Sequence, residues 1–233
     1  AIAGARMGFA GRTMNAFAWD WNFALSCLPE LLAGLKLTLI ATLFGSLIAA
    51  VLGLVMCLLK IARIPVVSPI MSFWIQLVRG TPLLIQLYLV FYVAPTWGLT
   101  FPALATGICA IGLYYGAYAA EIYRAGIEDL PVGQWEAALT LGLPLRRVWF
   151  GVVLPQAVRA VLPMLANMVI AMFKETALLS SITIMEMLAA GKAIGSIHFR
   201  YVEPLTMVGM LYFAISYASA RAIRTMETPR AGN

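Results

Sequence analysis

The sequence predicts an all-α integral membrane protein with about five transmembrane helices. Of its 233 residues, 62% are hydrophobic and only 11% are charged, and the mean hydropathy is +0.90. Soluble domains carry about 25% charged residues, so this composition excludes an ordinary soluble domain. The charges cluster between long uncharged runs. Because a charge at the centre of a bilayer costs several kcal/mol, the uncharged runs locate the membrane spans.

Charges and prolines define the first two spans. The first, 37–59, lies between Lys36 and Lys60 and has the roughly 20 residues that a bilayer requires. In the second, Pro82 disfavours helical geometry at Thr81, which predicts a kinked or broken helix. Small residues recur along the first span at four-residue spacing: Ala41, Gly45, Ala49 and Gly53. Such a stripe lets another helix approach closely, either within the chain, which is the simpler use, or at a dimer seam.

Three further spans follow, bounded by charges, prolines and turn residues: up to 120, 148–173 and 204–220. The third carries a GxxxG pattern at Gly112 and Gly116, which is typical of helix contacts. We expect Pro155 and Pro163 to kink the fourth. The stretch 177–203 is predicted to form a short re-entrant or surface helix and a loop, with Gly191 and Gly195 as breaks.

Five spans place the two ends of the chain on opposite sides of the membrane. With the C-terminus inside, ten basic residues, Arg79 among them, fall in inner segments and six in outer ones. This asymmetry favours an N-out, C-in orientation. The chain then divides into three parts, which are an extracytoplasmic or interfacial segment 1–28, a transmembrane domain 29–223 and a cytoplasmic tail 224–233. The loop 128–155 falls in the cytoplasm.

Motifs for catalysis or metal binding are scarce. His198 is the single histidine, so neither an HExxH site nor a Ser-His-Asp set can be built. Gly191-Lys192 resembles the end of a phosphate-binding loop. However, Glu186 and Ala193 stand where that motif needs Gly and Ser or Thr. We therefore expect no metal and no ATP site in this chain, which argues against a membrane enzyme.

A polar island at 131–155 interrupts the apolar runs. Pro131 and Pro144 can each start a helix, and Gly142 between them can allow a sharp bend. The pattern predicts two short helices joined by that bend. The island is too polar to span a bilayer and too small to be a domain, so we expect an external partner to use it.

The spacing in this island carries a family resemblance. Glu136-Ala137-Ala138, Gly142, Val152 and Leu154-Pro155 resemble the EAA-x3-G-x9-I-x-LP cytoplasmic loop of ABC importer permeases. Val152 replaces the usual Ile, Pro144 the usual Ser, and Ala177 a common Ser. The polar amino-acid permease subfamily is resembled further over most of 25–223, at three ordered stretches: 79–88, 118–124 and 174–182.

The resemblance implies a type I ABC importer permease fold with cytoplasmic coupling helices that dock into separate ABC ATPase subunits. ATP and Mg would be bound by that ATPase, so this chain would hold no cofactor and would not itself be an enzyme. Further implied partners are an extracytoplasmic solute-binding protein and a second permease copy or homologous permease, in the lipid of a bacterial inner membrane. The implied coupling residues are Gly133, Gln134, Glu136, Ala137, Ala138, Gly142, Leu154 and Pro155.

Ionisable residues within spans are functional hypotheses by default. The substrate-path candidates are Arg79, Gln86, Lys174, Glu175, Thr176 and Ser180. Lys174 beside Glu175 could recognise the carboxylate and ammonium of a zwitterion, which fits a polar or charged amino acid or a related solute. The alternative is that these charges pair within the chain or reach the interface. Rival functions are an autonomous secondary transporter or channel, which often shows internal repeats, and a membrane scaffold.

Overall fold

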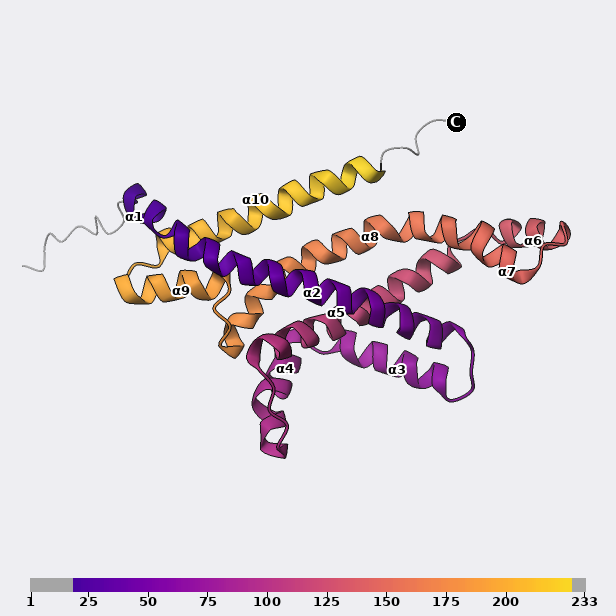
Figure 1. Cartoon of the computed structure of the whole chain (residues 1–233), viewed down its shortest axis with the longest axis horizontal. Coiled ribbons are helices and arrows are strands. Elements are labelled where there is room, and N and C mark those ends of the chain that lie inside the picture. The colour runs from indigo at the N-terminus through magenta and orange to yellow at the C-terminus, as the bar shows by residue number, and fades with distance from the viewer. Residues whose placement is uncertain (1–18, 228–233) are drawn as a thin grey trace, which may run out of the picture.

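The computed structural model describes residues 19–227, and all regular secondary structure in that range is helical, as predicted (Figure 1). Most of segment 1–28 and the end of tail 224–233 lie outside these residues. The α-helices are α1 (Trp21–Ser26), α2 (Leu28–Ile61), α3 (Val67–Gly80), α4 (Leu83–Tyr88), α5 (Ala103–Glu128), α6 (Val132–Thr140), α7 (Leu145–Val148), α8 (Leu154–Glu175), α9 (Met187–His198) and α10 (Val202–Glu227). Four tighter or wider helical segments complete the set: η1 (Leu89–Val93), η2 (Ala94–Trp97), η3 (Trp149–Val153) and η4 (Thr176–Ile182).

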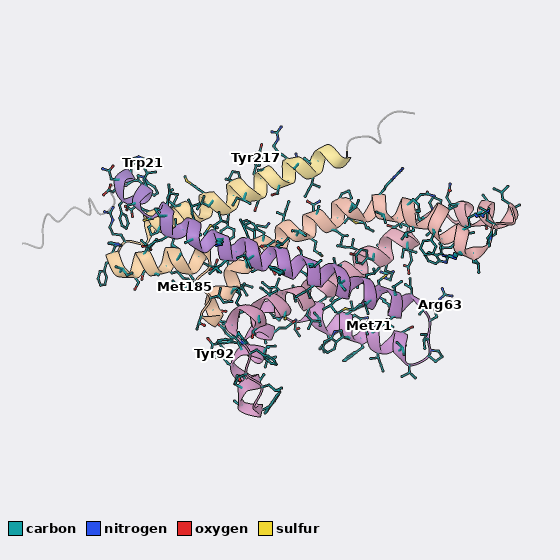
Figure 2. All side chains as sticks on the ribbon, in the orientation of Figure 1. Trp21, Arg63, Met71, Tyr92, Met185 and Tyr217 are labelled. Carbon is teal, nitrogen blue, oxygen red and sulfur yellow. The ribbon has the colours of Figure 1, made fainter. Side chains whose placement is uncertain are left out.

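The long helices run along one axis, and the two ends of the molecule differ. Helices α6 and α7 project at one end, and α1 and α9 lie at the other (Figure 1). Figure 2 shows Trp21 at the α1 end and Arg63, in the loop between α2 and α3, toward the α6–α7 end. The α2–α3 loop and helices α6 and α7, all predicted to be cytoplasmic, therefore lie toward the same end of the bundle.

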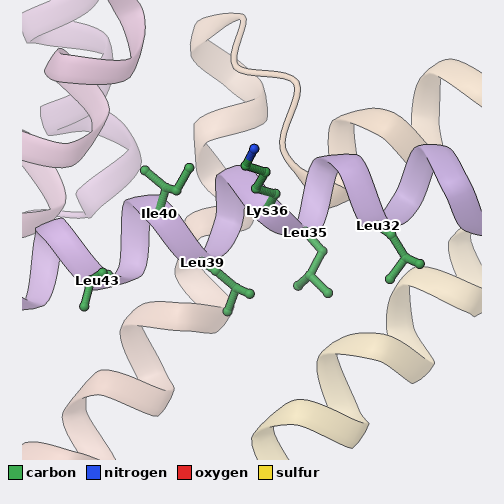
Figure 3. Close-up of a pocket in the computed structure, with 6 residues that line it drawn as sticks. All are labelled: Leu32, Leu35, Lys36, Leu39, Ile40 and Leu43. Carbon is green, nitrogen blue, oxygen red and sulfur yellow. The ribbon is translucent and has the colours of Figure 1, made fainter.

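Helix α2 is longer than the predicted first span. It starts nine residues earlier than predicted, at Leu28, and therefore includes Lys36. Figure 3 shows Lys36 on α2, where it and five apolar residues of the same helix line a hollow of about 320 Å³. No other helix contributes to the lining, so this hollow is an open flank of α2 rather than a closed site. A lysine near a helix end can reach the interface with its long side chain.

Close contact between α2 and α5 forms the centre of the bundle. A Cβ on Gly53 would lie 2.5 Å from Cβ of Ala119 and 2.8 Å from the carbonyl oxygen of Gly116. A Cβ on Gly112 would lie 2.6 Å from the Ile48 side chain. The stripe of small residues on α2 thus packs against α5 of the same chain. The stripe was predicted to serve either packing within the chain or a dimer seam, and packing within the chain is confirmed.

The predicted break in the second span is confirmed. Helices α3 and α4 meet at an angle of 100°, and Thr81 between them is extended. Pro82 has no N–H, so the carbonyl of Val78 loses its helical partner. The Gln86 side chain replaces it, because Nε2 donates to Val78 O at 2.8 Å and to Thr81 Oγ1 at 2.7 Å.

The remaining prolines are accommodated in different ways. Pro155 lies in the first turn of α8, where a missing N–H is tolerated. The turn before it, η3, is widened into a π-helix. Pro163 lies inside α8. The predicted fourth span is therefore α8 together with the helical turns on either side of it.

Within residues 19–227, three helical stretches are long and apolar enough to cross a membrane, namely Leu28–Ile61, Ala103–Glu128 and Leu145–Ile182, and the bent α3–α4 pair makes a fourth if it counts as one span. The predicted fifth span, α10, has the length but not the mean hydropathy. Five spans and the N-out, C-in orientation therefore stay predictions.

Arg79 does not belong to the inner charges as predicted, because it lies at the far end of α3, about 20 Å along the helix from the α2–α3 loop.

The stretch before α10 corrects one prediction. Gly191 and Gly195 do not break the chain but lie inside α9. A Cβ on Gly191 would lie 2.7 Å from the Val208 side chain, so glycine here lets α9 pack closely on α10. Glu186 is fully buried and caps α9 by accepting the N–H groups of Leu188 and Ala189 at 2.9 and 2.7 Å.

We expect Gly53→Ala to destabilise the protein by about 1–3 kcal/mol, since the added methyl group forces α2 and α5 apart. The melting temperature of the purified protein in detergent measures this. Gly209→Ala is the matched control, because a Cβ at Gly209 meets nothing within 4 Å. A Gly53→Ala protein as stable as the parent would contradict the account of α2–α5 packing.

Candidate functional site

The polar island forms a bent pair of short helices, which we call the elbow (residues 131–153). Gly142 adopts a left-handed conformation with φ +69°. Its N–H donates to Leu139 O at 2.9 Å, and the N–H of Leu143 donates to Ala138 O at 3.2 Å. These two bonds form a Schellman cap, which favours glycine at this position. The predicted bend is confirmed, although both helices begin one residue after their prolines.

The elbow has a small core of its own. Ala138 is only 4% exposed, and it clusters with Val148 and Val153. The rings of Trp135 and Trp149 meet edge to face with centroids 5.1 Å apart. Ala138 therefore packs inside the elbow rather than facing outward. Sequence reasoning gave these tryptophans no role, although both stand seven residues from Gly142.

The outer surface of the elbow carries most of the predicted coupling residues. Gly133, Gln134, Glu136 and Ala137 are exposed, as are Leu154 and Pro155 at the start of α8. Large apolar side chains are exposed beside them: Val132, Leu139, Leu141, Leu145 and Phe150. Leu141 is 78% exposed. Clustered apolar exposure on a projecting element is typical of a protein–protein contact surface.

A second feature is a cavity of about 340 Å³ between α5 and α8. It is lined by Tyr114, Tyr115, Tyr118, Ile122, Met164, Met168, Ala171 and Glu175. Oε2 of Glu175 is buried and has no hydrogen-bond partner within residues 19–227. Tyr114 and Tyr118 hydroxyls lie 3.2 Å apart, and the Arg79 guanidinium lies 5.0 Å from the centre of the Tyr118 ring. Glu175 therefore lines the cavity, and Arg79 lies beside one of the rings that line it.

The chemistry of this cavity favours a cationic group as its occupant. A buried carboxylate oxygen such as Oε2 of Glu175 is costly while it lacks a partner, and a cationic donor can supply one. The faces of tyrosine rings attract cations as well. The sequence analysis gave these tyrosines no role, although Tyr118 begins one of the stretches that resemble the permease subfamily. Tyr114 and Tyr118 are four residues apart in a helix and therefore lie on one face.

The other substrate-path candidates lie elsewhere. Lys174 is exposed and does not line the cavity, because successive helical residues point about 100° apart. Gln86 braces the α3–α4 break. The Thr176 hydroxyl is buried and donates to Phe173 O at 2.6 Å, and the Ser180 hydroxyl lies 3.4 Å from Nζ of Lys192.

A helical bundle with a cavity lined by tyrosines and Glu175 and with a projecting elbow fits the transmembrane subunit of a transport complex. Residues 41–231 match the family model described as binding-protein-dependent transport system inner membrane component. The chain therefore belongs to this family.

Individual relatives agree with that membership. The chain is 41% identical to a probable amino-acid ABC transporter permease of Sinorhizobium fredii, over 92% of this chain and 95% of the relative. It is 33% identical to the L-cystine transport system permease of Bacillus subtilis, over 87% and 88%. The resemblance to amino-acid ABC importer permeases is confirmed.

Solved structures show the same fold. An amino acid ABC transporter, solved with histidines, superposes with a TM-score of 0.87 at 33% identity, covering 91% of this chain and 99% of that one. The inward-facing MetNI methionine ABC transporter gives a TM-score of 0.64 at 17% identity, covering 89% and 99%. The predicted type I importer fold is therefore confirmed.

We expect Gly142→Val to destabilise the elbow by about 1–2 kcal/mol, since a side chain is disfavoured in the left-handed conformation. Hydrogen exchange of the amides in α6 and at the bend measures the change and should be faster. Gly133→Val is the control because that glycine has helical geometry and open space around it. Equal exchange rates in both variants would contradict the role of the cap.

Proposed function

We propose that this subunit carries a polar or cationic amino acid, or a related zwitterionic solute, across a bacterial inner membrane. The half-buried Glu175 in the tyrosine-lined cavity carries this proposal, because its Oε2 is buried and accepts no hydrogen bond within residues 19–227. Its carboxylate binds the ammonium group, and Arg79, which lies at the edge of the same cavity, is the counterpart for a carboxylate. The relatives named for amino acids, among them arginine and L-cystine permeases, support this solute class.

The elbow is the contact for a separate ABC ATPase. Its exposed apolar side chains fit a hydrophobic cleft, and Glu136 can pair with a basic group there. The ATPase binds ATP and Mg, and a binding protein delivers the solute at the opposite face. A second permease copy or a homologous permease completes the complex.

Helix α8 links the two features mechanically. It begins directly after the elbow and ends at Glu175, a length of about 33 Å. Closure of the ATPases moves the elbow, and the helix transmits that movement to one wall of the cavity. ATP binding therefore selects between two packings of the same helices, one open to each side.

Glu136→Lys is expected to weaken ATPase binding at least about tenfold, because a charge at the contact surface is reversed. The Glu136 carboxylate makes no hydrogen bond or ion pair within the described chain, so folding should not change. Co-purification with the ATPase and solute uptake are the measurements. Asp129→Lys, an exposed charge reversal just before the elbow, is the control. Intact ATPase binding by Glu136→Lys would refute docking through this residue.

Glu175→Gln should lower solute uptake about tenfold or more while the complex still assembles, since the ammonium group loses its charged partner. Uptake of radiolabelled amino acids in proteoliposomes measures this. Glu30→Gln, an exposed acid in the first turn of α2, should leave uptake unchanged. If Glu175→Gln transports like the parent, the cavity is not the solute site, whereas docking through the elbow is unaffected by that result.

A further inference from the structure

A cavity of about 960 Å³ lies where the elbow meets the ends of α2 and α5. We call it the boundary groove (the cavity between the α2–α3 loop, α5 and the elbow). Leu58, Ile61 and Ile127 form apolar parts of its wall, and Trp135 and Trp149 close the side toward the elbow. Because α2 and α5 are membrane spans that end here, the groove lies at the boundary between hydrocarbon and water. Tryptophan side chains are enriched at this depth.

Three basic side chains, Lys60, Arg63 and Arg124, and the carboxylate of Glu128 line the groove. Nζ of Lys60 lies 2.5 Å from Oε1 of Glu121, and Arg124 donates to Oε2 of the same carboxylate at 2.8 Å. Arg124 also pairs with Glu128. These bonds hold Lys60 and Arg124 in place between two helices. The carboxylates of Glu121 and Glu128 balance them, so the positive charge left over is that of Arg63.

Unlike Lys60 and Arg124, Arg63 has a guanidinium group that can bind a ligand. Its side chain is exposed and forms no hydrogen bond or ion pair with residues 19–227. Its backbone is left-handed, with φ +52°, a conformation that disfavours side chains other than glycine. Figure 2 shows Arg63 in the loop after α2, at the elbow end of the bundle. A guanidinium group can bind phosphate oxygens through two parallel N–H bonds.

We propose that the boundary groove binds the phosphate of an anionic phospholipid, with Arg63 as its main ligand and Lys60 and Arg124 flanking it. A lipid fits better than a free phosphate ion because apolar surface continues outward from the groove. Leu58 is 51% exposed and Val66 is 68% exposed, so both can contact acyl chains. Basic pockets between membrane helices on the cytoplasmic side commonly bind lipid headgroups.

Native mass spectrometry of the delipidated permease–ATPase complex tests this. The complex is titrated with dioleoyl phosphatidylglycerol and, separately, with dioleoyl phosphatidylcholine. We expect the anionic lipid to bind more tightly, and Arg63→Gln to weaken its binding about fivefold, the usual effect of one basic residue near an anionic surface. Arg159→Gln, which removes an exposed arginine from α8, is the matched control and should bind like the parent.

Arg63→Gly is a control for misfolding, because glycine adopts the left-handed conformation without strain. It should lose the lipid as Arg63→Gln does while the ATPase still co-purifies. Equal affinity of the parent and both Arg63 variants would overturn the proposal, and so would equal binding of the two lipids. Displacement of phosphatidylglycerol by millimolar inorganic phosphate would identify an ion site instead of a lipid site.

Discussion

The close approach of α2 and α5 is the constraint on which the other features depend. Glycine and alanine at the contact leave no room for a side chain, since even a methyl group on Gly53 would overlap Ala119. Lipid gives helices little hydrophobic reason to associate, so such close packing supplies much of the attraction in membranes. Once α5 is fixed, its tyrosines face α8 across the cavity, and its end at Glu128 sets where the elbow starts.

Local chemistry in the sequence predicted the features that depend on a few adjacent residues. Gly142 predicted the bend in the elbow because a helix cap of this kind needs one left-handed residue. Pro82 predicted the break between α3 and α4 because proline lacks an N–H. Tertiary contacts were outside the reach of such reasoning. Gly191 looks like a break until α10 is packed against it. Lys174 and Glu175 are adjacent in the chain but point in different directions once they lie on a helix.

The kind of site could be predicted from the sequence, but only some of the residues that form it could. The coupling residues in the elbow were implied by the family resemblance, and most of them are exposed, yet Ala138 packs inward because the elbow has a core of its own. In the cavity, charge alone pointed to Arg79 and Glu175. Gln86 was chosen for its polarity, whereas the structure uses its amide to satisfy a carbonyl that Pro82 leaves free. Whether a polar side chain serves the backbone or a ligand depends on neighbours that the sequence does not order in space.

The paired indoles of Trp135 and Trp149 have a consequence for how the complex forms. Because they and Ala138 hold the elbow together without help from another protein, its shape exists before any encounter. Under the proposal that an ATPase docks on the elbow, the partner meets a preformed surface and does not have to order a flexible loop, so association loses less conformational entropy. Rigidity also preserves lever action, since a force applied at one tip of the elbow reaches α8 as rotation instead of being absorbed by bending.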